Sequence, residues 1–270
     1  MSTLVFIAQY PQLVGIPLIL IYGLWRYRSN ASRNQQPTDW LIAATALAIP
    51  AELVAQALTA WMSSLRPLKL DLYVYCLDGT LGFQPSFVIG RVVEQHFWLK
   101  MILAFTYGSC SLAMLSVLAA YLRCRSRSEV LVAMKAFALN LFAALPIYLL
   151  IPVCGPKFAF PGFPSSVLQQ VSPHAMAIWA PPNGVPSVHF STALLVAWLA
   201  RHWFWGRILG PAYVVLTAVV TLGSGQHYLF DLIAAVPYAF LIYRISRADA
   251  TNRRPGNKHW RDSEQVCVKL

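Results

Sequence analysis

The sequence predicts an all-α, polytopic transmembrane helix bundle with six to seven spans. Of the 270 residues, 57% are hydrophobic and only 11% are charged, whereas a soluble domain usually carries about a quarter charged residues. Apolar segments of about 20 residues, the length that crosses a bilayer core, recur along the chain. The basic residues, which give a formal net charge of +11, cluster between and after these segments. This distribution is typical of membrane loops and argues against a nucleic-acid-binding surface.

Seven segments are long and apolar enough to span a membrane. They lie near residues 4–24, 41–62, 97–122, 130–153, 188–205, 208–224 and 227–244. The first has no basic region ahead of it and no small-residue cleavage site, so we expect a retained helix. Glu52 falls inside the second, where it needs a polar partner or has a functional role. We therefore expect a single transmembrane domain over residues 1–247 and a polar, cytoplasmic tail over 248–270.

The basic residues assign a side to every connection between the predicted helices. They are Arg26, Arg28 and Arg33; Arg123, Arg125 and Arg127; Arg201 and Arg207; and, near and in the tail, Arg244, Arg247, Arg253, Arg254, Lys258 and Arg261. With seven helices all four groups lie on one side, which the positive-inside rule makes cytoplasmic. The connections 63–96 and 154–187 are then extracytoplasmic. The first is semi-apolar and is expected to lie in the interface or fold over the bundle. The second is rich in Pro and Gly and is expected to be a lid or binding loop.

The five cysteines show no CxxC pair and no metal-ligand spacing, so neither a disulfide framework nor a metal centre is expected. One isolated bridge, between Cys76 and Cys154 in the two outer connections, stays open beside the alternative of unpaired thiols.

Two short stretches open predicted helices on the same outer face. One runs from Gly184 to His189 at the entrance of the fifth segment, and the other from Gly225 to Asp231 at the entrance of the seventh. His227 and Asp231 are spaced i, i+4, so their side chains are expected to meet on one helix face. A carboxylate there can accept a hydrogen bond from one ring nitrogen and make the other more nucleophilic.

The same place suits an anionic substrate. The partial positive charge at the N-terminus of the seventh helix favours a phosphate. Ser187 is predicted to cap the fifth helix, which leaves His189 in the first turn, facing the same anion. The alternative is that both histidines only reach from the interface to water and that Asp231 caps its own helix. Two histidines on one face, one with an i+4 aspartate, favour a shared site.

These stretches resemble the motifs of the type 2 phosphatidic acid phosphatase (PAP2) superfamily. Pro186-Ser187-Val188-His189 resembles its Pro-Ser-Gly-His motif, with valine in place of glycine, and His227-x-x-x-Asp231 resembles its third motif. The form His227-Tyr228-x-x-Asp231 is similar to the branch that contains the inositol phosphorylceramide synthases and sphingomyelin synthases. The stretch Pro152–Phe160 also resembles that branch, and the overall resemblance is strongest over about residues 140–245.

The resemblance implies a PAP2-like helical core and a phosphohistidine mechanism. It makes His227 the nucleophile that attacks phosphorus, Asp231 the residue that orients it, and His189 the general acid that protonates the leaving group. Splitting the reaction into two steps lets either water or an alcohol take the phosphoryl group. No metal and no other cofactor is implied.

The sequence departs from the superfamily at the positions that bind phosphate. The first motif, Lys-x6-Arg-Pro, is absent, and Val220 and Thr221 stand where the third motif has Ser-Arg. A phosphoryl-transfer transition state needs cations or amides around its equatorial oxygens. The candidates here are Lys157 and Arg91 in the outer connections, and the backbone amides near Ser187.

The expected function is an integral membrane lipid-phosphate phosphatase or phospholipid headgroup phosphotransferase. Its site would face away from the cytosol in a plasma, inner or endomembrane. Its partners would be a lipid phosphate or phospholipid and the bilayer, with no nucleic acid and the oligomeric state left open. The alternative is a non-catalytic transporter or lipid-binding protein that keeps the fold, which the missing arginines and Glu52 would suit.

Overall fold

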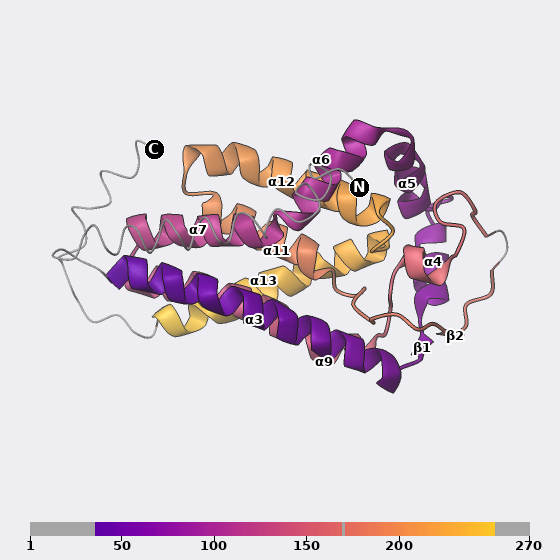
Figure 1. Ribbon diagram of the computed structural model, residues 1–270, viewed down its shortest axis with the longest axis horizontal. Coiled ribbons are helices and arrows are strands. Elements are labelled where there is room, and N and C mark those ends of the chain that lie inside the picture. The colour runs from indigo at the N-terminus through magenta and orange to yellow at the C-terminus, as the bar shows by residue number, and fades with distance from the viewer. Residues whose placement is uncertain (1–35, 169–170, 252–270) are drawn as a thin grey trace.

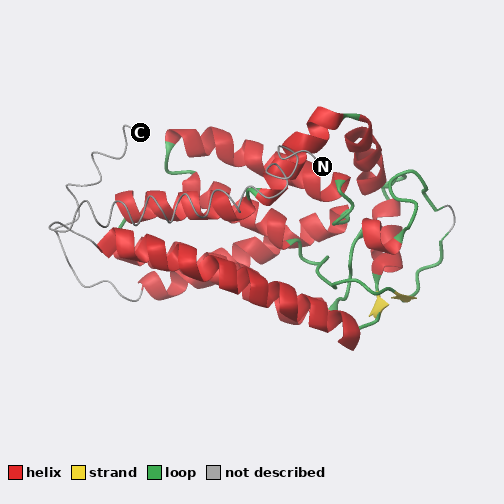
Figure 2. Cartoon of the chain, in the orientation of Figure 1, coloured by secondary structure: helices red, strands yellow, loops and turns green. Residues whose placement is uncertain are grey.

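The structure is a computed structural model that describes residues 36–168 and 171–251. In chain order its elements are α3 (Gln36–Leu65), β1 (Leu68–Lys69), α4 (Asp71–Gly79), α5 (Pro85–Gln95), α6 (Phe97–Gly108), α7 (Cys110–Cys124), α8 (Arg127–Phe142), α9 (Ala144–Leu150), α10 (Pro156–Ala159), β2 (Met176–Ala177), α11 (Val188–Ala200), α12 (Phe204–Gly223) and α13 (Leu229–Thr251). Long helices run along the molecule's long axis, and short helices and both strands gather at one end (Figure 1). The described part is mostly helical, as the sequence predicts (Figure 2).

Three described helical segments are long and apolar enough to cross a membrane: Ser128–Leu150, Phe204–Gly223 and Leu229–Ala248. A fourth span results if α6 and α7, which meet at a bend of 51°, are taken together. These four correspond to the segments predicted near 130–153, 208–224, 227–244 and 97–122. The segment predicted at 4–24 lies outside the described residues, as do residues 252–270 of the predicted tail. Helix α13 continues to Thr251, past the predicted domain boundary at 247.

The fifth predicted span is shorter than expected. Its helix, α11, has 13 residues, which at about 1.5 Å per residue is too short for a bilayer core of about 30 Å. After α11 the chain turns at once into α12, which begins at Phe204 instead of near residue 208. A Cβ added to Gly210 of α12 would lie 3.1 Å from the Cα of Ala197 in α11. The glycine thus lets the two backbones approach closely, as small residues do between membrane helices.

Helix α3 contains the second predicted segment, 41–62, and extends it at both ends. Glu52 accepts hydrogen bonds there from the Ser111 hydroxyl of α7 at 3.3 Å and from the Gln56 amide at 3.5 Å. Glu52 therefore has polar partners, one of which links two helices of the bundle.

A buried asparagine links three helices near the start of α11. Its side chain donates to the Thr192 hydroxyl at 2.8 Å and accepts from the Ser191 hydroxyl at 2.7 Å, and the carbonyl of this Asn140 accepts from Tyr238 at 2.6 Å. A buried polar group without a partner costs roughly 1–3 kcal/mol in proteins. These bonds therefore specify how α8, α11 and α13 pack against each other.

The connections 63–96 and 154–187 fold together into one unit, which we call the end cap (residues 66–95, 152–168 and 171–187). Strands β1 and β2 pair antiparallel across it, with Leu68 opposite Ala177. An aromatic cluster fills its interior, with ring centroids 5.6 Å apart for Phe87 and Phe160 and 4.7 Å apart for Tyr75 and Phe160. The prediction that residues 63–96 fold over the bundle or lie in the interface resolves into two short helices that pack against α13 and α12.

The end cap also settles the open disulfide question. Cys76 and Cys154 are both free thiols. The Cys76 thiol lies 3.4 Å from the Val171 carbonyl, and the Cys154 thiol lies 3.4 Å from a carboxylate oxygen of Asp71. No bridge joins them.

Candidate active site

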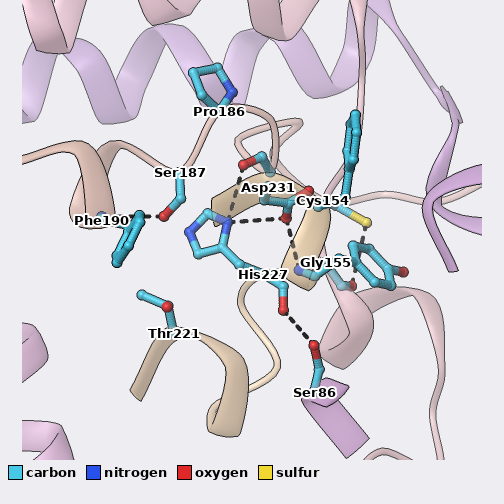
Figure 3. A network of polar contacts seen from close by, with 12 residues as sticks. Ser86, Cys154, Gly155, Pro186, Ser187, Phe190, Thr221, His227 and Asp231 are labelled. Carbon is cyan, nitrogen blue, oxygen red and sulfur yellow. Dashed lines mark hydrogen bonds and ion pairs between the residues drawn. The ribbon is translucent and has the colours of Figure 1, made fainter. Parts of the chain in front are cut away.

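His227 and Asp231 are in contact and buried. The Nδ1 atom of His227 lies 3.3 Å from Oδ2 of Asp231 and 3.1 Å from the Gly184 carbonyl oxygen (Figure 3). The histidine is 3% exposed and the aspartate 0%. Asp231 lies in the first turn of α13, which starts at Leu229. His227 therefore lies in the connection before the helix, whereas the sequence predicts it inside the helix. The side chains meet because the turn folds the ring back over the helix start.

The surroundings of His227 decide where its ring proton lies. Both atoms near Nδ1 are acceptors, one a carbonyl oxygen and the other a carboxylate oxygen. Nδ1 must therefore carry hydrogen, and in the neutral ring Nε2 keeps its lone pair. A histidine in this tautomer is prepared to act as a nucleophile through Nε2.

The backbone of His227 is held from two further elements. Its N–H donates to the Thr221 carbonyl at 3.2 Å, at the end of α12, and its carbonyl accepts from the Ser86 hydroxyl of α5 at 2.9 Å. Gly225, with φ of +69°, makes the turn between them, and a Cβ there would collide with the ring of Phe163. The ring is thus positioned by α5, α12 and α13 together.

Ser187 caps α11 as the sequence predicts. Its hydroxyl accepts from the Phe190 N–H at 3.4 Å, and its own N–H donates to the Asp231 carbonyl at 3.3 Å. The second bond links the two sequence motifs directly, so the starts of α11 and α13 lie side by side.

His189 is the second residue of α11. Its ring stacks on Tyr107 of α6, with centroids 4.0 Å apart and planes inclined by 22°. His189 and His227 are near enough for their charges to interact. Within the described ranges the His189 ring has no hydrogen-bond partner, so its nitrogens are available to a substrate.

At the start of α13, where an anion was expected, three backbone amides are already paired with carboxylates. The N–H groups of Leu229 and Phe230 donate to Asp78 at 2.8 and 3.1 Å, and that of Tyr228 donates to Asp231 at 2.9 Å. Carboxylates already accept from these three amides, so the three are not free to bind a phosphate. At the start of α11, by contrast, the amides of residues 188 and 189 have no partner among the residues that the structure describes.

The two predicted cations lie beside the site without touching its histidines in the described structure. Lys157 is exposed on α10, and its backbone N–H donates to the Gly225 carbonyl at 2.9 Å. Arg91 is half-buried on α5, the helix whose Ser86 contacts His227. Neither side chain makes a hydrogen bond or ion pair with another described residue, so both remain free for a ligand.

Two buried aspartates of the end cap, Asp71 and Asp78, are not among the site residues predicted from the sequence. The Asp71 carboxylate, 0% exposed, accepts from the N–H groups of Cys154 and Gly155 at 3.1 and 2.8 Å and from the Tyr228 hydroxyl at 3.1 Å. Burial raises the pKa of both Asp71 and Asp78 to about 6. One signal was available: the two aspartates are seven residues apart, which places them on one face of a helix within a semi-apolar stretch.

A glycine sets how closely the 152–160 stretch approaches the site. Gly155 has φ of +99°, and a Cβ there would collide with the backbone carbonyl of Gln226, next to His227. We expect Gly155→Ala to lower turnover and to destabilise the fold by more than the roughly 1–3 kcal/mol of backbone strain alone. Gly82→Ala is the matched control, because Gly82 also has a positive φ, +83°, but open space around it. Equal melting temperatures and turnover for the two variants in detergent would contradict this account.

The described ranges contain no group of three or more His, Cys, Asp and Glu side chains arranged to hold a metal ion. The polar groups near His227 are instead tied to backbone atoms and to one another, as Figure 3 shows.

Comparison with known proteins extends the resemblance to the end cap. The chain matches the model of the PAP2 superfamily over residues 72–245, which takes in α4 and α5 as well as both motifs. No curated protein matches the chain, and no solved structure matches it. Members of this superfamily are phosphoesterases or phosphotransferases. Because the match covers well over half of its length, the chain belongs to the PAP2 superfamily.

Proposed function

We propose that this protein hydrolyses or transfers a lipid-linked phosphate through a phosphohistidine intermediate on His227. One observation carries the proposal: a buried histidine whose Nδ1 faces two acceptors, the Asp231 carboxylate and the Gly184 carbonyl. This arrangement leaves Nε2 as the nucleophilic nitrogen. Membership of the superfamily supports phosphoester chemistry at that atom.

The reaction would proceed in two displacements at phosphorus. Nε2 of His227 attacks, the bond from phosphorus to the leaving oxygen breaks, and protonated His189 gives that oxygen its proton. Water or an alcohol then gives a proton to His189 and attacks the phosphohistidine, which releases His227. Asp231 keeps the ring oriented and offsets the positive charge that the ring gains in the first step.

The phosphate would be bound mainly by the start of α11. The free amides of residues 188 and 189 can donate to its oxygens. The Ser187 hydroxyl accepts from Phe190 and keeps its own hydrogen to donate. Lys157 and Arg91 would supply the charge that the missing arginines supply elsewhere in the superfamily.

The charge balance of the site favours a phosphodiester over a phosphomonoester. Asp231 accepts from the Tyr228 N–H and Asp78 accepts from the Leu229 N–H, so both carboxylates lie beside the residues that follow His227. Ionised carboxylates at that distance repel a dianionic monoester more than a singly charged diester. We therefore propose a phospholipid as donor and headgroup transfer as the leading reaction, in line with the inositol phosphorylceramide and sphingomyelin synthase branch. Hydrolysis of a lipid phosphate is the alternative within the same chemistry.

We further propose that residues 1–247 form one transmembrane domain with the site on the extracytoplasmic side and the C-terminus in the cytoplasm. The arginine distribution supports this orientation, because with seven helices every basic connection is predicted to lie on the side opposite the connections 63–96 and 154–187.

Product analysis tests the proposed function. Purified protein would be incubated with a panel of lipid phosphates and phospholipids, with and without ceramide as acceptor. We expect a new lipid that carries the donor headgroup, whereas release of free phosphate or free headgroup would indicate a hydrolase. If no substrate is consumed under any condition, the non-catalytic transporter or lipid-binding protein becomes the better account.

A further inference from the structure

Helix α4 presents two buried carboxylates to the segment that follows His227. Asp71 and Asp78 are two helical turns apart and are 0% and 4% exposed. Between them they bind the Tyr228 hydroxyl and the backbone N–H groups of Leu229 and Phe230. The three residues that follow His227 therefore all donate a hydrogen bond to one helix of the end cap, more than 140 residues away in sequence.

We propose that Asp71 and Asp78 are positioning residues that hold residues 228–230, and through them the His227 ring, in the reactive geometry. The inference rests on the proposed role of His227 as the nucleophile. Neither carboxylate is placed to meet the substrate, since their oxygens are already occupied by protein donors. Their effect on the reaction is therefore on rate and not on substrate binding.

Apart from the packing of Tyr228 in the core, few other hydrogen bonds hold this segment. Tyr228 N–H donates to Asp231, and His227 itself is bonded through its backbone to Thr221 and Ser86. Without Asp78, two partly buried amides at the start of α13 would lose their acceptor, which is unfavourable. The helix start would then shift to reach other acceptors. A displacement of about 1 Å of a reacting group can cost on the order of 100-fold in rate.

Asp71 also couples the segment to the other side of the site. The same carboxylate accepts from the N–H groups of Cys154 and Gly155, and Gly155 packs against the turn before His227. Burial raises the pKa of the Cys154 thiol, which therefore stays protonated and donates to Asp71. Asp71 is thus a junction that joins the 152–160 stretch to the histidine segment.

The hydrogen bonds that Asp71 and Asp78 accept depend on ionised carboxylates, because every partner is a donor. A protonated carboxyl would turn an O–H towards an N–H and lose that bond. Burial raises the pKa of Asp71 and Asp78 to about 6. Both carboxylates are therefore ionised and accept these bonds well above pH 6, and the bonds are lost as the pH falls through about 6.

Four other titratable side chains lie near the two carboxylates within the described residues. The groups near Asp71 are Lys69, Cys154 and Tyr228. The group near Asp78 is the Asp231 carboxylate, whose charge interacts with it. Burial lowers the pKa of Lys69, whose amino group donates to the Arg66 carbonyl. None of these side chains forms an ion pair with either carboxylate within the described part of the chain, so the carboxylates rely on hydrogen bonds.

The test compares kcat and KM of Asp71→Asn and Asp78→Asn with those of the unchanged protein between pH 5 and pH 8. At pH 7.5 we expect each variant to lose about tenfold or more in kcat while KM changes by less than about threefold. Near pH 5 the carboxylates of the unchanged protein are protonated and have lost these bonds, so the ratio of its kcat to that of each variant should shrink towards one. A merely structural role would give the same ratio at every pH. Glu94→Gln, an exposed acid on neighbouring α5, is the matched control and should leave both constants unchanged.

Tyr228→Phe guards against a variant that does not fold. It removes one bond to Asp71 without changing any charge, so we expect a smaller loss of kcat at pH 7.5, which shrinks towards pH 5 as Asp71 of the unchanged protein is protonated. His227→Ala is assayed alongside and separates the two levels of the account. Activity in His227→Ala would overturn the proposed function. An inactive His227→Ala together with Asp71→Asn and Asp78→Asn that match the unchanged protein at pH 7.5 would overturn the positioning role alone.

Discussion

Replacing His227 with Ala is expected to reduce turnover by about 10⁴-fold or more, because it removes the atom that attacks phosphorus. Within the described ranges no other imidazole contacts Asp231, and His189 lies on α11 with its ring against Tyr107. Turnover is measured as product lipid formed per protein in detergent micelles, on a substrate that the unchanged protein consumes.

The control for this variant is His174→Ala. His174 is exposed in the end-cap loop, where its ring contacts the Ser172 carbonyl, and its loss should leave turnover unchanged. The His227→Ala protein should remain monodisperse, because the Asp231 carboxylate it leaves behind still accepts from the Tyr228 N–H. A folded His227→Ala protein with more than a few per cent of normal turnover would contradict the mechanism.

Asp231→Asn is expected to lower kcat by about 100-fold, less than the roughly 10⁴-fold seen when such a substitution reverses the histidine tautomer. The structure explains the difference. Oδ2 takes both hydrogen bonds, from His227 and Tyr228, whereas Oδ1 is buried with no partner among the described residues. An asparagine can put its oxygen at the Oδ2 position and keep both bonds. What it loses is the negative charge that stabilises the phosphohistidine ring.

Asp231→Ala should be slower still, by about a further tenfold, because the ring loses its anchor on α13. The Gly184 carbonyl still accepts from Nδ1 and preserves part of the tautomer preference. The two rates are measured as single-turnover kcat values at saturating lipid. If Asp231→Asn keeps full activity, the charge of Asp231 plays no part in the reaction.

The sequence predicts the local contacts of this site better than the contacts between distant segments that support it. His227 and Asp231 follow from an i, i+4 spacing, and the Ser187 cap follows from residue type and position, since both are local relations. Asp71 and Asp78 bind partners 83 to 157 residues away, and no local pattern encodes such pairings. The occupied start of α13 escaped prediction for the same reason, because its acceptors come from α4.

The spans show a similar division. The segments that became α8 with α9, α12 and α13 are long, uniformly apolar stretches, so composition alone locates them. The short α11 and the bend between α6 and α7 depend on packing against neighbouring helices, which the hydropathy of a single segment does not record. Bounds near 188–205 were accordingly too long.

Trapping of a phosphohistidine tests the central claim most directly. The protein would be mixed for seconds with a phospholipid or lipid phosphate labelled at phosphorus, quenched in alkali, in which phosphohistidine survives, and digested for mass spectrometry. The account predicts label on the peptide that contains His227 and none in His227→Ala. Turnover without label on His227, or label on another residue, would contradict it.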